Sequence, residues 1–195
     1  MKTTTFALEK IAPQHLLAAG ALLALSLLTA RAAVTPKVGE AAPNFTLNTL
    51  EDKPVELNQL TAKKPVVLVV LRGWPGYQCP ICTRQVQDFA RNAAVFAAHD
   101  AQAVMVYPGP ADDLKAHARE FLQNKEWPKD FLFVIDPDYT FTNAYGLRWE
   151  ATKETAFPST FIIAKDNKVG FAHVSMKHGD RVDSTAALKA LTDIK

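Results

Sequence analysis

Cys79 and Cys82 are the residues of this sequence whose types and spacing most directly indicate chemistry. They are its only cysteines, in the run Cys79-Pro80-Ile81-Cys82. A disulfide across two intervening residues closes almost no loop, whereas disulfides stabilise a fold mainly by closing long ones. Structural stapling is therefore a poor explanation for the pair. The Cys-x-x-Cys spacing instead favours reversible dithiol–disulfide chemistry.

The sequence around the pair predicts a different role for each thiol. Residues 65–71 are a continuous apolar run, typical of a strand buried on both faces, and helical periodicity begins at Pro80. We therefore expect Cys79 at the N-terminus of a helix that runs to about Ala97. Unpaired backbone N–H groups and the helix dipole favour a thiolate there. Cys82, one turn further, is expected within disulfide reach, better buried and suited to be the resolving thiol.

Metal binding is the alternative chemistry for such a pair. A zinc site needs about four ligands, and the sequence contains no second cysteine pair. The histidines of the domain lie at no spacing that points to the pair: His99, His117, His173 and His178. The expected redox centre needs no cofactor and no metal. A copper- or metal-handling module and a structural domain with a vestigial pair remain the alternatives from other classes.

The first 32 residues have the pattern of a secretory signal peptide. Lys2 and Lys10 form a positive start, residues 16–30 carry no charge, and Ala30-Arg31-Ala32 places small residues before a cleavage point at Ala33. As a helix, this apolar stretch would span only ~22 Å of a hydrocarbon core that is ~30 Å thick. The sequence thus predicts a signal peptide over 1–32, a domain over 33–195, and a periplasmic or otherwise extracytoplasmic location. Membrane contact is expected only through an uncleaved signal segment.

Composition and charge indicate one globular domain. The chain has 195 residues, of which 48% are hydrophobic and 22% charged. Three of the 22 basic and one of the 20 acidic residues lie in the predicted signal, which leaves 19 of each and no net charge. No basic stripe with interleaved aromatic residues is present, so we expect no nucleic-acid partner.

The remaining periodicity predicts strands that alternate with helices. Residues 38–60 are expected to form a hairpin with its turn at 51–53. Further expected elements are strands at 103–107 and 131–135, helices at 112–123 and 139–145, a hairpin of 160–163 with 169–174, and a final helix at 184–194 capped by Ser184. This order indicates an α/β fold whose mixed sheet is covered by helices on both faces.

Three segments carry a resemblance to a known family. They are Val38-Gly39-Glu40-Ala41-Ala42-Pro43-Asn44-Phe45-Thr46-Leu47, then Asp136-Pro137-Asp138 with Ala144-Tyr145-Gly146-Leu147, and Pro158-Ser159-Thr160-Phe161-Ile162-Ile163. Through them, residues 38–174 resemble the redoxin superfamily, which contains peroxiredoxins of the alkyl hydroperoxide reductase / thiol-specific antioxidant group and exported thioredoxin-like reductases. The resemblance implies a thioredoxin-like mixed sheet with an N-terminal β-hairpin extension. It also implies that Pro158 faces the Cys79 side of the site after a cis Phe157–Pro158 bond.

The sequence departs from peroxiredoxins around the first cysteine. Gly76 and Arg72 stand where that family has a hydroxyl residue and a proline, and Pro158 lies where an arginine is common. Without such donors a site polarises a peroxide O–O bond less well. Arg72 could steady the Cys79 thiolate or be a solvated charge at a strand end.

The leading expectation is therefore an exported thiol oxidoreductase, in which Cys79 attacks and Cys82 resolves. Its partner would be a protein that bears a thiol or a disulfide. The alternative is a thiol-dependent peroxidase with a peroxide substrate, in which Cys79 becomes a sulfenic acid and condenses with Cys82.

Overall fold

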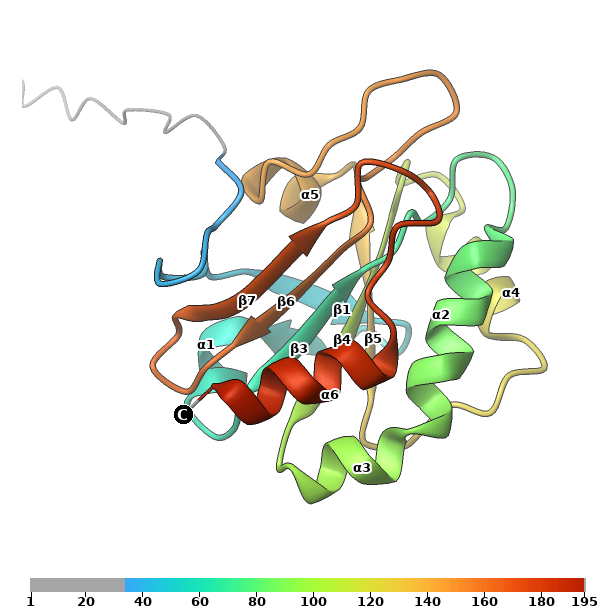
Figure 1. Ribbon diagram of the computed structural model, residues 1–195. Helices are drawn as coiled ribbons and strands as arrows, with labels where there is room; N and C mark the ends of the chain where they lie inside the picture. Colours follow the sequence, from blue (N-terminus) through green and yellow to red (C-terminus); the bar gives the residue numbers. More distant parts are fainter. Residues whose placement is uncertain (1–33, 195) are drawn as a thin grey trace, which may run out of the picture. The chain divides into compact units, whose positions relative to one another are not determined.

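The computed structural model describes residues 34–194, so the predicted signal segment lies outside the described residues (Figure 1). The strands are β1 (Thr46–Thr49), β2 (Pro54–Glu56), β3 (Val66–Val70), β4 (Gln102–Gly109), β5 (Leu132–Pro137), β6 (Ser159–Ile163) and β7 (Val169–Val174). The helices are α1 (Leu57–Thr61), α2 (Pro80–Arg91), α3 (Ala93–Ala98), α4 (Leu114–Leu122), α5 (Thr140–Ala144) and α6 (Ser184–Asp193). None of these helices is long and apolar enough to cross a bilayer.

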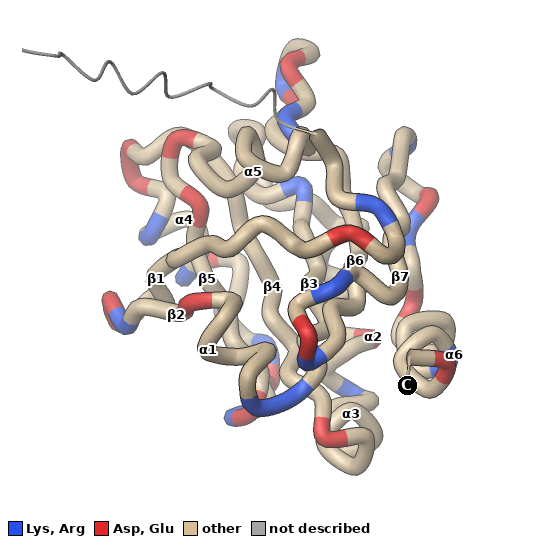
Figure 2. Tube along the Cα trace, turned by 90° about the vertical axis from the view of Figure 1, so that its left-hand side faces the viewer, with Lys and Arg blue, Asp and Glu red and all other residues tan. Residues whose placement is uncertain are grey.

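The seven strands form one mixed sheet in the order β2-β1-β5-β4-β3-β6-β7. Strands β3, β4 and β5 run parallel, while β6 is antiparallel to both β3 and β7. The β1–β2 hairpin pairs antiparallel with β5 at the far edge. All five residues of β3 are buried, and Figure 2 shows β3 and β4 without charged residues along their length. This burial is why the segment reads as an unbroken apolar run.

Helices cover both faces of the sheet. Alternation along β3 sends Val67 and Val69 to a core shared with α2, α3, α4 and α6. It sends Val66 and Leu68 to a second core shared with α1 and α5. The expected thioredoxin-like α/β fold, with its N-terminal β-hairpin extension, is confirmed.

The helix that was expected to reach Ala97 is two helices. Helix α2 ends at Arg91 because Asn92 has a non-helical backbone, with φ −100° and ψ 12°, and α3 starts at Ala93. The Asn92 side-chain amide donates to the Asp88 carbonyl at 3.1 Å, a local contact that competes with continued helix.

The cap of the last helix also differs from the prediction by one residue. Asp183 is the N-cap of α6, and its carboxylate accepts from the Ala186 N–H at 2.7 Å. Ser184 is the first helical residue instead, and its hydroxyl accepts from the Asn92 side chain at 2.9 Å. This contact joins the start of α6 to the end of α2.

Candidate active site

Cys79 is the N-cap of α2, as predicted. Its backbone is extended, Pro80 is the first helical residue, and the Cys82 N–H donates to the Cys79 Sγ at 3.3 Å. Proline fits this position because its missing N–H would have no helical partner. The sulfur of Cys79 therefore takes the place of a capping oxygen and faces the N–H groups of the first turn.

The loop between β3 and α2 is pinned against the end of β4. The Trp74 N–H donates to the Pro108 carbonyl at 2.9 Å. Gly73 has a φ of +73°, and a Cβ there would lie 1.8 Å from the Pro108 oxygen. Only glycine therefore allows this approach. The Trp74 ring stacks on His117 with centroids 3.7 Å apart, so Trp74 packs the loop onto α4.

The pKa values of the two thiols are shifted in opposite directions. The pKa of Cys79 is lowered to about 5, mainly by a hydrogen bond from the Cys82 thiol. Burial acts in the opposite direction, whereas backbone N–H groups and the charge of Arg181 lower the pKa further. Burial raises the pKa of Cys82 well above its ordinary value, and the hydrogen bond to Cys79 adds to the effect. Both cysteines are free, with exposures of 3% for Cys79 and 0% for Cys82. At neutral pH, Cys79 is thus a thiolate beside a protonated Cys82.

Arg181 contacts both sulfurs, and sequence reasoning missed it. Its Nη1 lies 3.3 Å from the Cys82 Sγ and its Nη2 lies 3.8 Å from the Cys79 Sγ. Arg181 belongs to the segment between β7 and α6, 99 residues after Cys82. No spacing in the sequence connects it to the cysteines. Its only local signal is a basic residue just before a helix.

Arg72 has a different environment from the one expected. Its side chain is buried, so the expectation of a solvated charge is wrong. Its Nε and Nη2 donate to the two Glu154 carboxylate oxygens at 2.6 and 3.0 Å, Nη2 also donates to the Lys153 carbonyl, and Nη1 donates to the Tyr77 hydroxyl. It is the backbone N–H of Arg72 that acts on Cys82, by lowering the pKa of that thiol. A direct role of the guanidinium on Cys79 stays a prediction.

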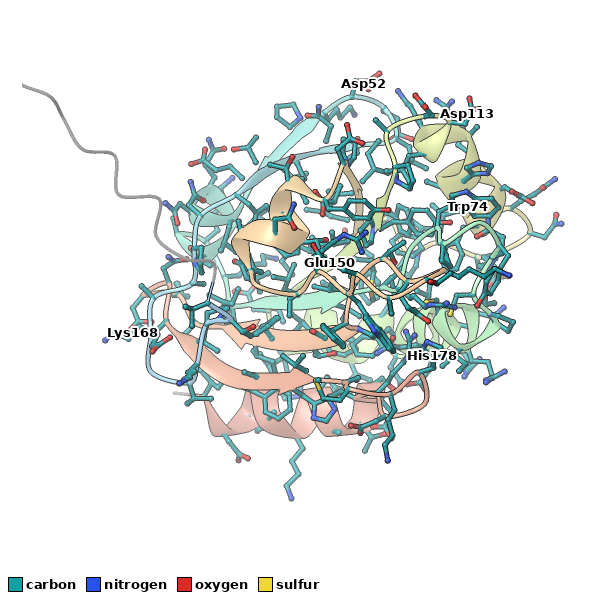
Figure 3. The ribbon with its side chains drawn as sticks, turned by 90° about the horizontal axis from the view of Figure 1, so that it is seen from above. Asp52, Trp74, Asp113, Glu150, Lys168 and His178 are labelled. Carbon is teal, nitrogen blue, oxygen red and sulfur yellow. The ribbon has the colours of Figure 1, made fainter. Side chains whose placement is uncertain are left out.

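Glu154 also joins Arg72 to the segment that carries Arg181. The His178 Nε2 lies 2.9 Å from the second Glu154 oxygen, and the His178 carbonyl accepts from the Arg181 Nε at 2.8 Å. Figure 3 shows Trp74 and His178 on the loops near the start of α2. Three loops that are distant in the sequence are therefore held together at this end of the sheet.

Pro158 lies at the same end of the sheet as the cysteine loop. It precedes Ser159, which pairs with Val70, the last residue of β3. Every peptide bond in residues 34–194 is trans, so the expected cis Phe157–Pro158 bond is wrong. A catalytic role for Pro158 stays a prediction.

A metal site receives no support from these side chains. Within residues 34–194, no group of three or more His, Cys, Asp or Glu residues is arranged to hold a metal ion. The Arg181 guanidinium also places a positive charge beside both sulfurs, where a metal cation would have to bind. Repulsion between the two cations would oppose metal binding.

Comparison with known proteins agrees with this site. Residues 38–172 match the AhpC/TSA family. The chain is 26% identical to the thiol-disulfide oxidoreductase ResA of Halalkalibacterium halodurans over 137 residues, which covers 70% of this chain and 68% of the relative. It is also 26% identical to peroxiredoxin Bcp of Bacillus subtilis over 167 residues, which covers 83% of this chain and 98% of the relative.

A solved structure shares the fold. The crystal structure of peroxidoxin BcpB from Mycobacterium tuberculosis superposes with a TM-score of 0.63 at 24% identity, over 82% of this chain and 99% of that one. Since the family match covers most of the described domain, the chain belongs to the AhpC/TSA family and is a thiol-dependent oxidoreductase or peroxidase.

Proposed function

We propose that the protein is an exported thiol–disulfide oxidoreductase in which Cys79 is the nucleophile and Cys82 the resolving thiol. The observation that carries this proposal is the placement of two free thiols within one helical turn, with Cys79 as the N-cap of α2, its sulfur 3.3 Å from the Cys82 N–H, and Cys82 fully buried. The pKa of Cys79 is lowered to about 5, whereas that of the buried Cys82 is raised. A stable thiolate next to a protonated thiol is what sequential attack and resolution require.

The reaction takes two exchange steps. The Cys79 thiolate attacks one sulfur of a substrate disulfide, the substrate S–S bond breaks, and one substrate thiolate leaves. Cys82 then loses its proton and attacks the Cys79 Sγ, which releases the second substrate thiolate. The enzyme dithiol is oxidised to a disulfide and the substrate is reduced. Because the stabilised Cys79 thiolate favours the reduced enzyme, we expect a more oxidising couple than two ordinary thiols would form.

Export is proposed from the sequence of residues 1–32. It places the domain in a periplasmic or other extracytoplasmic compartment, where disulfides persist and a disulfide-bearing partner is available. N-terminal sequencing of the protein recovered from the extracytoplasmic fraction should give Ala33 as the first residue. Recovery of the full-length chain in the cytoplasm would contradict export.

Peroxide reduction is the second candidate, and two observations favour it. The Arg181 guanidinium provides a donor near the Cys79 sulfur, and the 3% exposure of Cys79 admits a small molecule more easily than a large one. In this reaction the Cys79 thiolate attacks one peroxide oxygen, the O–O bond breaks, and water or an alcohol leaves, so that Cys79 becomes a sulfenic acid. The Cys82 thiol then attacks the Cys79 sulfur, which forms the disulfide and releases one water. The Gly76 position provides no hydroxyl to polarise the peroxide, which is why we place this reaction second.

One experiment separates the two candidates. The fully reduced protein is mixed separately with hydrogen peroxide and with bis(2-hydroxyethyl) disulfide at equal concentrations, and the loss of free thiols is followed. We expect the disulfide to react faster. Cys82→Ser should trap a mixed disulfide through Cys79, whereas Cys79→Ser should lose both reactions. Fast peroxide consumption without any disulfide reaction would establish the second candidate instead.

A further inference from the structure

We propose that Arg181 is a catalytic residue of the resolving step: its guanidinium first balances the Cys79 thiolate and then supports the Cys82 thiolate once Cys79 is held in a mixed disulfide. The inference rests on the proposed two-step exchange and adds a residue that neither the family match nor the sequence pattern assigns.

The position of Arg181 is fixed by neutral groups. Its Nε donates to the His178 carbonyl at 2.8 Å, and its Nη1 donates to the Gln85 Oε1 at 3.0 Å. The amide of Gln85 in turn donates to the Val182 carbonyl at 3.0 Å. These contacts leave Nη1 and Nη2 facing the two sulfurs at 3.3 and 3.8 Å. The planar guanidinium of Arg181 can therefore interact with either cysteine without a change of rotamer.

The charge of Arg181 is available to the sulfurs. Among residues 34–194, no carboxylate forms a salt bridge with it, and Glu154 pairs with Arg72 and His178. Arg84 of α2 is exposed, and the side-chain hydrogen bonds to the two sulfurs within residues 34–194 come from Arg181 instead. Arg181 is thus the cation that faces both thiols. A hydrogen bond from a charged donor is about twice as strong as one from a neutral donor.

The two sulfurs depend on Arg181 to different degrees. Cys79 also accepts from backbone N–H groups, such as that of Cys82 at 3.3 Å, which remain when Arg181 is removed. Cys82 is fully buried, and Arg181 is the main group that opposes the effect of burial on its pKa. Removing the guanidinium should therefore affect the resolving thiol more than the attacking one.

The first step of exchange changes the balance of charge at Cys82. In the reduced enzyme, the Cys79 thiolate raises the pKa of Cys82 through its charge and its hydrogen bond. When Cys79 is in a mixed disulfide, its sulfur is neutral and both effects end, while the guanidinium remains. The pKa of Cys82 therefore falls at the stage when Cys82 must lose its proton to solvent. The thiolate then forms the bond to the Cys79 Sγ, and the bond from Cys79 to the substrate sulfur breaks.

Single-turnover kinetics with 4,4′-dithiodipyridine test this role. This neutral disulfide releases one thiopyridone when Cys79 attacks and a second when Cys82 resolves. We expect Arg181→Gln to slow the second release by about 10- to 100-fold, the size expected for a lost charged hydrogen bond, and the first release by less. Arg181→Lys keeps the positive charge but lacks the two guanidinium N–H groups that face the sulfurs, so its second release should have an intermediate rate. Arg84→Gln, the matched control, should leave both phases within about twofold of wild type.

Two further readouts separate chemistry from structure. The Arg181→Gln enzyme should accumulate the mixed disulfide by mass spectrometry, and its second phase should need a higher pH than that of the wild type. A merely structural defect would lower the melting temperature without moving this pH profile. Equal slowing of both phases, or an unchanged second phase, would overturn the proposal.

The probe also keeps this inference separate from the proposed function. Because 4,4′-dithiodipyridine reacts with any accessible thiolate, both phases can be measured even when the physiological substrate is a peroxide. A wild-type protein that reacts with the probe but not with bis(2-hydroxyethyl) disulfide would contradict the disulfide exchange function. The effect of Arg181→Gln on the second phase would still decide the role of Arg181.

Discussion

The pKa of Cys79 gives the most direct test of how the site works. With a pKa of about 5, Cys79 is roughly 99% thiolate at pH 7, whereas an ordinary value of 9.0 would leave about 1%. The rate of alkylation of Cys79 by iodoacetamide should therefore rise between pH 4 and 6 and then level off. Because the pKa is depressed, reactivity is present above about pH 5 and is lost as the pH falls through that value.

Two variants at Cys82 test which group lowers the pKa of Cys79. The Cys82 thiol is the largest single cause, and the backbone N–H of the same residue is a separate one. Cys82→Ala removes the thiol hydrogen bond and keeps the backbone N–H hydrogen bond. Loss of one hydrogen bond to a charged group costs about 1.5–3 kcal/mol, which raises the midpoint by roughly 1 to 2 pH units. Cys82→Ser retains a hydroxyl donor and should therefore have a midpoint closer to that of the wild type.

The assay is the pH dependence of alkylation, with the modified residue identified by peptide mass. Circular dichroism at each pH confirms that the protein stays folded over the range used. A wild-type midpoint near 9, or first modification at Cys82, would refute the assignment of Cys79 as the thiolate. Identical midpoints for the Ala and Ser variants would refute the hydrogen bond from the Cys82 side chain as the main cause.

Three other predictions follow from the same loops. Glu154→Gln leaves the buried Arg72 charge without its carboxylate and should reduce the free energy of unfolding by about 3–5 kcal/mol, measured with urea; a loss under about 1 kcal/mol would contradict the buried ion pair. Gly73→Ala combines a φ of +73° with a Cβ 1.8 Å from the Pro108 oxygen, so it should destabilise the protein by about 2 kcal/mol or more and change the alkylation rate of Cys79; unchanged stability and rate would show that the loop can relax. Reduction of hydrogen peroxide, followed by peroxide consumption, should be about 10²–10³-fold slower than in dedicated peroxidases because the Gly76 position offers no hydroxyl donor; a rate within about tenfold of theirs would contradict this view.

The sequence by itself determined the parts of this protein that depend on short-range patterns. An unbroken apolar run predicts β3, and the change of period at Pro80 places Cys79 at a helix N-terminus, because burial and helical repeat both act over a few residues. The same logic failed where a local side-chain contact competes with the helix, as at Asn92. It also failed by one residue at the α6 cap, where Asp183 and Ser184 are both good capping types.

Only the tertiary structure decided which charged groups surround the cysteines. Arg181 contacts Cys82, which is 99 residues away in the sequence, and Arg72 contacts Glu154, which is 82 residues away. The loops that carry them meet because they lie at the same end of the sheet. Neither arginine lies in a repeating pattern, so their spacing carries no information about their partners. The role of Arg181 depends on where β7 and α6 hold the segment between them, and the packing of both elements against the core sets that position.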